Sequence, residues 1–374
     1  MSTEGGCTIH QAGGLTEATL IGHVPEALAR VPGIEIDSVQ REVRVAGHVV
    51  DLVVIGTVRG RRVRFVVEAR AGGYPRDARE AARRVTEAVK QVASTRREEQ
   101  PIHDVPMIVA RFLSPASREM LRDMRVSYWD AGGSLYVDLP WAMYWIDRPA
   151  APRQRRKTQR IFRGSSAQVV HALLLDPGRA WHLTDLAEMA DVSVSTAHQV
   201  CNALEAQLWM EKEGSGPRTV RRVLEPGSVL DAWAADHSLE RYTPLRYYRW
   251  TRSSEELLDD VADALERGGI EYALTLSSGA RFIAPYATDL GQLWVLVPES
   301  AAIEEVASAA GLRPVDEGET VTFFVTRERS PLLFRQRIGD YWVASDIQLY
   351  LDLAAWPRRG REQAHHLRAE RLQF

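Results

Sequence analysis

The chain has 374 residues, of which 45% are hydrophobic and 26% are charged, and its formal net charge is −3. This length predicts about two or three domains, and the composition is typical of a globular protein. The negative net charge excludes a uniformly basic nucleic-acid binder, so contact with DNA would have to come from local basic patches.

The cysteine content and the absence of targeting patterns indicate the compartment. Cys7 and Cys201 are too few to build a disulfide framework, which is typical of a reducing environment. The sequence has no basic stretch leading into an apolar signal core, and no apolar run approaches the length of a membrane span. We therefore expect a cytoplasmic protein with no membrane partner.

The first block, residues 1–146, alternates strand patterns with helix patterns. Helical periodicity covers residues 15–29, 75–97 and 115–124, and strand patterns cover residues 34–39, 43–55, 61–69, 105–112, 126–129 and 134–139. This alternation predicts an α/β/α domain, in which a central sheet carries helices on both faces.

Two carboxylates interrupt apolar strands of this block. Asp51 lies within the run VVDLVV, and Glu68 ends the run FVVE, two residues before Arg70. A charge inside an apolar strand is costly unless it is paired or serves a site. Asp51 and Glu68 are therefore candidate ligands of one Mg²⁺, with Arg70 as a cation near the attacking water.

Residues 147–164 are rich in proline and arginine and predict a basic linker. Arg155, Arg156 and Lys157 are its central cations. Two interpretations remain open: a solvated flexible tether, or an arm that follows the phosphate backbone or enters a minor groove.

Residues 165–236 predict a winged helix-turn-helix. A helix over residues 185–190, capped by Thr184, is followed by a turn at Asp191 and Val192 and by a second helix that ends near residue 207. The second helix has an apolar stripe at helical spacing, in which Cys201 is a small core residue rather than a reactive thiol. The members of the predicted stripe are Val194, Ala197, Val200, Cys201, Leu204 and Leu208.

The polar face of the second helix and the following hairpin are the candidate DNA contacts. Strands at 209–213 and 219–224 flank a glycine-containing loop and carry Arg218, Arg221 and Arg222, as a DNA-contacting wing would. The short polar side chains suited to base edges are Ser195, Thr196, His198, Gln199 and Asn202. The alternative is an internal helical hairpin with a surface β-hairpin.

Residues 237–374 predict an α+β domain. Helices are expected at 254–267, 301–310, 346–355 and 361–372, and strands at 272–276, 281–284, 292–297, 312–315 and 321–326. The aromatic and basic stretch 239–250 suits an interdomain or dimer contact, although it could also clamp nucleic acid. The Ser-Gly turn at Ser278 and Gly279 lacks a following Asp-x-Asp pair, so nucleotidyl transfer is not predicted.

The first block resembles the PD-(D/E)xK restriction-endonuclease-like superfamily. The resemblance rests on Asp51 and on the pattern Glu68-x-Arg70, after a helix that carries Glu17 and Glu26, either of which could be the first motif residue. The family normally has lysine where this chain has Arg70. A guanidinium stays protonated and is a poor base, so the resemblance implies an inactive domain that needs no cofactor, with Mg²⁺ only if the site is active.

The whole chain resembles AbiEi-like antitoxins of type IV toxin–antitoxin systems and related winged-helix regulators. The resemblance rests on the order of the blocks, on the exit EPG…LDAW after residue 224, and on the segments SDIQLYLDL at 345–353 and RRGREQA at 358–364. It implies operator binding and autorepression by the winged helix, and a C-terminal domain that contributes to antitoxin action against a cognate toxin.

Three functions follow from these observations. The leading hypothesis is a non-enzymatic transcriptional regulator that binds double-stranded DNA, by default as a homodimer on an inverted repeat. The second is a metal-dependent DNA endonuclease that uses Asp51 and Glu68. The third is an interaction protein that neutralises a toxin without binding DNA.

Overall fold

The computed structural model describes residues 16–45, 48–94, 102–149, 160–286, 291–357 and 360–374. The chain is a mixed α/β protein that divides into two compact units. The first contains Met1–Arg156 together with Ala206–Leu208, and the second contains Lys157–Glu205 and Trp209–Phe374. Among the described helices, none combines the length and the apolar character needed to cross a bilayer.

A seven-stranded sheet forms the centre of the first unit, with its strands in sequential order. β1 to β3 form an antiparallel meander, β3, β4 and β5 are parallel, and β5 to β7 return to antiparallel pairing. The strands are β1 (Ile34–Val45), β2 (His48–Val58), β3 (Arg61–Arg70), β4 (His103–Ala110), β5 (Ser127–Asp130), β6 (Leu135–Leu139) and β7 (Ala142–Ile146).

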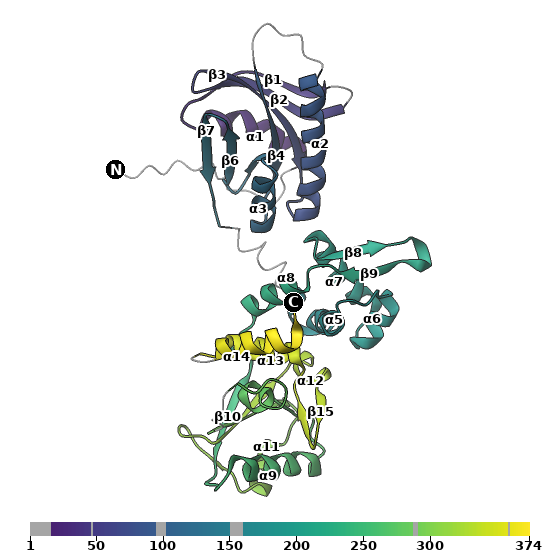
Figure 1. Cartoon of the computed structure of the whole chain (residues 1–374), viewed down its shortest axis with the longest axis vertical. Coiled ribbons are helices and arrows are strands. Elements are labelled where there is room, and N and C mark those ends of the chain that lie inside the picture. The colour runs from purple at the N-terminus through teal and green to yellow at the C-terminus, as the bar shows by residue number, and fades with distance from the viewer. Residues whose placement is uncertain (1–15, 46–47, 95–101, 150–159, 287–290, 358–359) are drawn as a thin grey trace, which may run out of the picture. The chain divides into compact units, whose positions relative to one another are not determined.

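Helices cover both faces of this sheet, as the alternation of patterns predicted (Figure 1). α1 (Glu17–Ala29) buries Leu20, Val24 and Leu28 in the core on one face. α2 (Pro75–Ser94) and α3 (Pro115–Asp123) pack against the core on the other face, which contains Val50, Val66 and Tyr128.

Two strand predictions in the first unit were wrong. Residues 34–39 and 43–55 were expected as separate strands, but β1 is continuous from Ile34 to Val45 and pairs with β2. Its second half is an exposed edge strand rich in polar residues, so it lacks the apolar alternation that marks a half-buried strand. β7, the other edge strand, was not predicted for a related reason, since Met143 and Trp145 are exposed.

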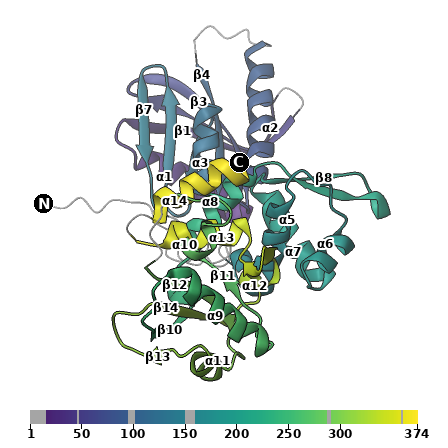
Figure 2. The ribbon, with the colours of Figure 1, turned by 60° about the horizontal axis from the view of Figure 1, so that its bottom comes forward.

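The second unit begins with a bundle of short helices and a hairpin. α5 (Gly164–Leu175) is buried along most of its length and packs against α6 (Leu183–Met189). α7 (Val194–Ala206) leads into β8 (Met210–Glu213) and β9 (Val220–Val223), and α8 (Pro226–Asp236) follows. The hairpin projects away from the helices, as Figures 1 and 2 both show.

A second seven-stranded sheet completes this unit, in the order β13-β10-β14-β12-β11-β16-β15. α9 (Ser254–Arg267) and α11 (Ile303–Ala309) lie on one side of its strands, and α13 (Asp346–Ala355) and α14 (Gly360–Leu367) lie on the other (Figure 1). The strands are β10 (Thr243–Tyr248), β11 (Ala273–Leu274), β12 (Leu293–Pro298), β13 (Arg313–Pro314), β14 (Val321–Thr326), β15 (Gln336–Ile338) and β16 (Tyr341–Val343).

Three predictions for residues 237–374 need correction. Residues 281–284 are not a strand, because α10 (Leu276–Ala280) is followed by tight turns in which the Ala284 amide donates to the Ala280 carbonyl. The stretch 239–250, predicted as an interdomain or dimer contact or as a clamp on nucleic acid, contributes β10 to the sheet. The small elements α12 (Ser330–Leu333), β15 and β16 were missed because they are too short to show periodicity.

One hydrophobic core runs across the predicted domain boundary at residues 236/237. It joins Val170 and Leu173 of α5 and Trp233 of α8 to Phe323 of β14 and Leu349 of α13. Residues 165–205 and 209–236 thus belong to the same compact unit as the C-terminal sheet.

Candidate nucleic-acid interface

The turn between α6 and α7 has the local chemistry of a tight helix–helix connection. Asp191 adopts a left-handed backbone with φ of 49°, which Asp tolerates better than most residues, and the Val192 amide donates to the Ala187 carbonyl. Ser193 caps α7, since its Oγ accepts from the Thr196 amide at 3.1 Å. Thr184, predicted as the cap of α6, instead lies inside that helix, whose N-cap is His182.

α7 has one buried and one exposed face, close to the prediction. Ala197, Val200, Cys201 and Leu204 are buried. The predicted polar face is exposed at Ser195, His198, Gln199 and Asn202, whereas Thr196 is half-buried. Val194, assigned to the buried stripe, is 47% exposed because it is the first residue of the helix and extends beyond the core.

Cys201 is a core residue, as predicted. Burial raises the pKa of its thiol to about 12, so a thiolate is not formed near neutral pH. The residue is therefore inert packing beneath the polar face.

The hairpin β8–β9 is anchored on Trp181 and carries cations on both strands and in the connecting loop. Backbone hydrogen bonds join Trp181 and Arg221 in both directions, at 2.8 and 2.9 Å. Arg218 and Lys212 are exposed, and Lys212 was not among the predicted contacts. Arg222 is 42% exposed and donates from Nη1 to the Gly178 carbonyl at 2.8 Å, so it is partly committed to the fold.

Arg221 does not belong to the candidate DNA contacts, contrary to the prediction. Its side chain is 4% exposed, and its Nε donates to Glu205 Oε1 at 2.9 Å. The two residues tie β9 to α7. The basic surface of the hairpin therefore consists of Lys212, Arg218 and Arg222.

Replacing Arg221 with alanine is expected to loosen the hairpin, because Glu205, only 13% exposed, would lose its partner. Hydrogen exchange of the β8 and β9 amides should accelerate in this variant. Arg218→Ala, at an exposed position, is the matched control and should leave exchange unchanged. Equal acceleration in both variants would contradict the structural role of Arg221.

The linker cations Arg155, Arg156 and Lys157 lie outside the described residues. Their part in DNA contact stays a prediction.

The two candidate carboxylates of the first unit lie close together, but each already accepts a hydrogen bond. Asp51 precedes Leu52 on β2 and Glu68 follows Val67 on β3, and Leu52 and Val67 are paired across the two strands. Asp51 Oδ2 accepts from the Ala69 amide at 2.7 Å, and Glu68 Oε1 accepts from Arg70 Nη2 at 2.8 Å. Burial and the nearby Asp51 raise the pKa of Glu68, although Arg70 acts in the opposite direction.

The alternative first motif residues differ in position. Glu17 Oε1 accepts from the Ala71 amide at 3.0 Å, close to Arg70 in sequence, whereas Glu26 of α1 pairs with Arg30, the residue that follows the helix. Within the described ranges, no three His, Cys, Asp or Glu side chains group closely enough to hold a metal ion. A divalent cation between Asp51 and Glu68 would have two carboxylates as ligands, and Glu68 would have to give up its contact with the Arg70 guanidinium.

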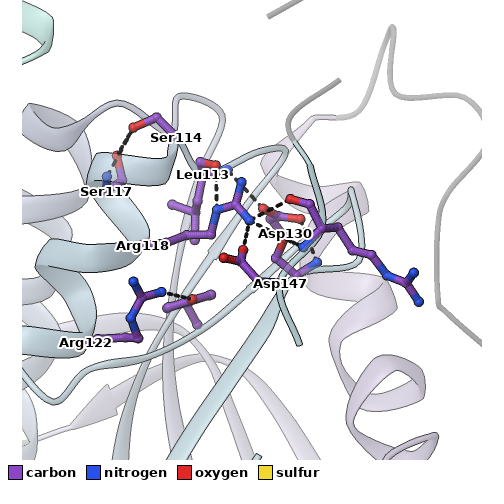
Figure 3. Close-up of polar contacts among 10 residues, drawn as sticks. Leu113, Ser114, Ser117, Arg118, Arg122, Asp130 and Asp147 are labelled. Atoms are coloured by element: carbon purple, nitrogen blue, oxygen red, sulfur yellow. Dashed lines mark hydrogen bonds and ion pairs between the residues drawn. The ribbon is translucent and has the colours of Figure 1, made fainter. Parts of the chain in front are cut away.

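A second polar cluster lies around Asp130, the last residue of β5 (Figure 3). Arg118 of α3 is buried and donates to the Leu113 carbonyl, to Ser134 Oγ and to Asp147. Asp130 accepts from the amides of Leu113 and Ser134, each at 3.1 Å, and burial raises its pKa. Backbone groups take up most of its hydrogen-bonding capacity, so this cluster is structural.

Two buried polar clusters in the second unit were missed by the sequence interpretation. Asp352 of α13 is fully buried and accepts from Tyr242, Thr275 and Gln348 at 2.6–3.0 Å, with His237 Nε2 at 2.8 Å. Its only sequence signal is a lone acidic residue inside the apolar run LYLDLAA.

The second of these clusters surrounds His171 of α5. The two ring nitrogens lie 3.2 Å from Ser330 Oγ and 2.6 Å from Ser345 Oγ, and the imidazole contacts Phe334 and Trp233. Burial lowers the pKa of His171 to about 3, so the ring is neutral at physiological pH. The cluster joins the first helix of the unit to the elements that follow β14.

A comparison of the chain with family models, curated proteins and solved structures finds no match in any of the three.

Proposed function

We propose that this protein is a DNA-binding transcriptional regulator whose α5–β9 segment acts as a winged helix-turn-helix. The observation that carries the proposal is the exposed polar face of α7, which precedes a projecting hairpin with three accessible cations. On this proposal α7 enters the major groove, and Lys212, Arg218 and Arg222 contact phosphates.

The charge distribution supports this division of roles. The exposed face of α7 has no Lys or Arg side chain, so non-specific attraction to DNA must come from the hairpin and from other basic segments. The first unit would then be a restriction-endonuclease-like domain without cleavage activity, since Arg70 holds Glu68. This proposal agrees with a cytoplasmic AbiEi-like antitoxin that binds its own operator as a homodimer, represses transcription from it and acts against a cognate toxin.

DNA binding by the full chain tests the proposal. The protein should select a specific duplex from genomic fragments, and Lys212→Ala/Arg218→Ala should weaken binding to all sequences and lower the salt slope by about 2. Arg327→Ala, which removes an 84% exposed cation elsewhere in the unit, should leave both unchanged. Absence of specific binding by the unmodified protein would overturn the proposal and favour a toxin-neutralising interaction protein.

The nuclease alternative has its own test. Plasmid DNA incubated with the protein and Mg²⁺ or Mn²⁺ is expected to stay intact. Arg70 is a poor base, and its guanidinium already donates a hydrogen bond to the Glu68 carboxylate. Arg70→Lys should show whether the family cation restores cleavage. Cleavage by the unmodified protein that disappears in Asp51→Ala would assign catalysis to this site.

A further inference from the structure

The exposed face of α7 presents two amides, a hydroxyl, an imidazole and a valine. Ser195, Gln199 and Asn202 follow one another at helical spacing, and Val194 and His198 lie beside them. All five are exposed. This face therefore offers hydrogen-bond donors and acceptors but no Lys or Arg side chain.

Gln199 and Asn202 are also free to make new hydrogen bonds. Within the described part of the chain, the Gln199 side chain has no hydrogen-bond or ion-pair partner. The amide nitrogen of Asn202 lies 3.4 Å from His198 Nε2, a long contact that costs little to give up. Neither side-chain amide is therefore held by a short hydrogen bond.

The chemistry of these side chains distinguishes the bases of a major groove. An Asn or Gln amide donates to N7 and accepts from N6 of adenine, whereas guanine presents two acceptors that suit Arg or Lys. The face has no Arg or Lys among Val194–Ala206. The methyl groups of Val194 suit the thymine methyl group, which reinforces the same choice.

We propose that α7 reads A·T base pairs, with Gln199 and Asn202 each recognising one adenine. This inference rests on the proposed winged-helix function and adds the kind of sequence that it selects. The operator half-site is then rich in A·T pairs where α7 enters the groove. Sites with G·C pairs at those two positions are bound with low affinity by the protein.

Selection from a randomised pool of DNA duplexes by the full-length protein tests the inference. The selected sites should contain adenine at two positions in each half-site. Gln199→Ala should reduce discrimination at one of them by about ten- to a hundredfold while leaving the other unchanged. Gln199→Arg should shift that position towards guanine.

The control Ser308→Arg adds the same charge at an exposed position of α11 and should leave the selected sequence unchanged. Specific sites with G·C pairs at the positions sensitive to Gln199 would overturn the inference while leaving DNA binding intact. Failure to select any sequence would instead overturn the proposed function, so the two failures are distinct.

Discussion

Asp352→Ala is expected to destabilise the second unit by about 3–5 kcal/mol, because several buried donors would lose their acceptor at a cost of about 1–3 kcal/mol each. The carboxylate is fully buried and accepts hydrogen bonds from Tyr242, Thr275 and Gln348. Burial and Asp352 raise the pKa of Tyr242 well above its ordinary value, so the phenol keeps its proton and remains a donor. Without Asp352 these donors would be left unsatisfied in the core.

Urea unfolding combined with hydrogen exchange of α13 and β11 amides measures this loss. Asp352→Asn keeps the volume of the side chain and should cost less than the alanine variant, because it retains one acceptor oxygen. Asp316→Ala, at an exposed loop position, is the control and should change stability by less than about 0.5 kcal/mol. A small effect of Asp352→Ala would show that the cluster contributes little to the fold.

Acid is expected to weaken the second unit through His171. In the unfolded chain its imidazole takes up a proton below pH 6.5, whereas burial delays protonation in the folded state to about pH 3. Between these values the unfolded state binds more protons, so stability falls as the pH falls, by about 1.4 kcal/mol per pH unit. At pH 5 the titration of His171 should have lowered the free energy of unfolding by about 2 kcal/mol.

His171→Gln separates this effect from other titrations, because glutamine is neutral at every pH. The variant loses packing and is expected to be less stable at pH 7, but its stability should decline less steeply between pH 7 and pH 5. Hydrogen exchange of the α5 amides follows the second unit alone. An unchanged pH slope in the variant would show that other groups cause the acid sensitivity.

The sequence predicted long, regular elements well and short or polar ones poorly. α13 was expected at 346–355, where the structure places it, because Ser345 caps a strongly apolar helix. β1 and β7 are edge strands with polar or exposed faces, so no burial pattern marked their extent. α12, β15 and β16 have only three or four residues each, too few to show a periodic pattern, and were missed. The strands predicted at 272–276 and 312–315 are present but shorter, as the two-residue strands β11 and β13.

The candidate site shows a similar division. Helical periodicity separated the two faces of α7 correctly except at the two ends of the predicted stripe. Val194, the first helical residue, is exposed, and Leu208 lies beyond the end of α7, half-buried and with a left-handed backbone (φ 61°). Arg221 was misassigned because the hairpin cations were treated as one group, although Val223, two residues later, is buried and residues two apart share a face of a strand. That alternation was sufficient to identify Arg221 as inward-facing. The partners of Asp352 lie 4 to 115 residues away, so no spacing rule could have assembled that cluster.

The continuous core across residues 236/237 limits where the chain can be cut to make fragments or chimeras. A fragment ended at residue 236 would keep the helices and the hairpin but would expose Val229, Leu230 and Trp233, which are buried in the whole chain. Such a fragment would be poorly soluble, and chimeras that exchange the hairpin-bearing segment alone would inherit a mismatched core. Residues 160–374 should therefore be exchanged between proteins as one piece.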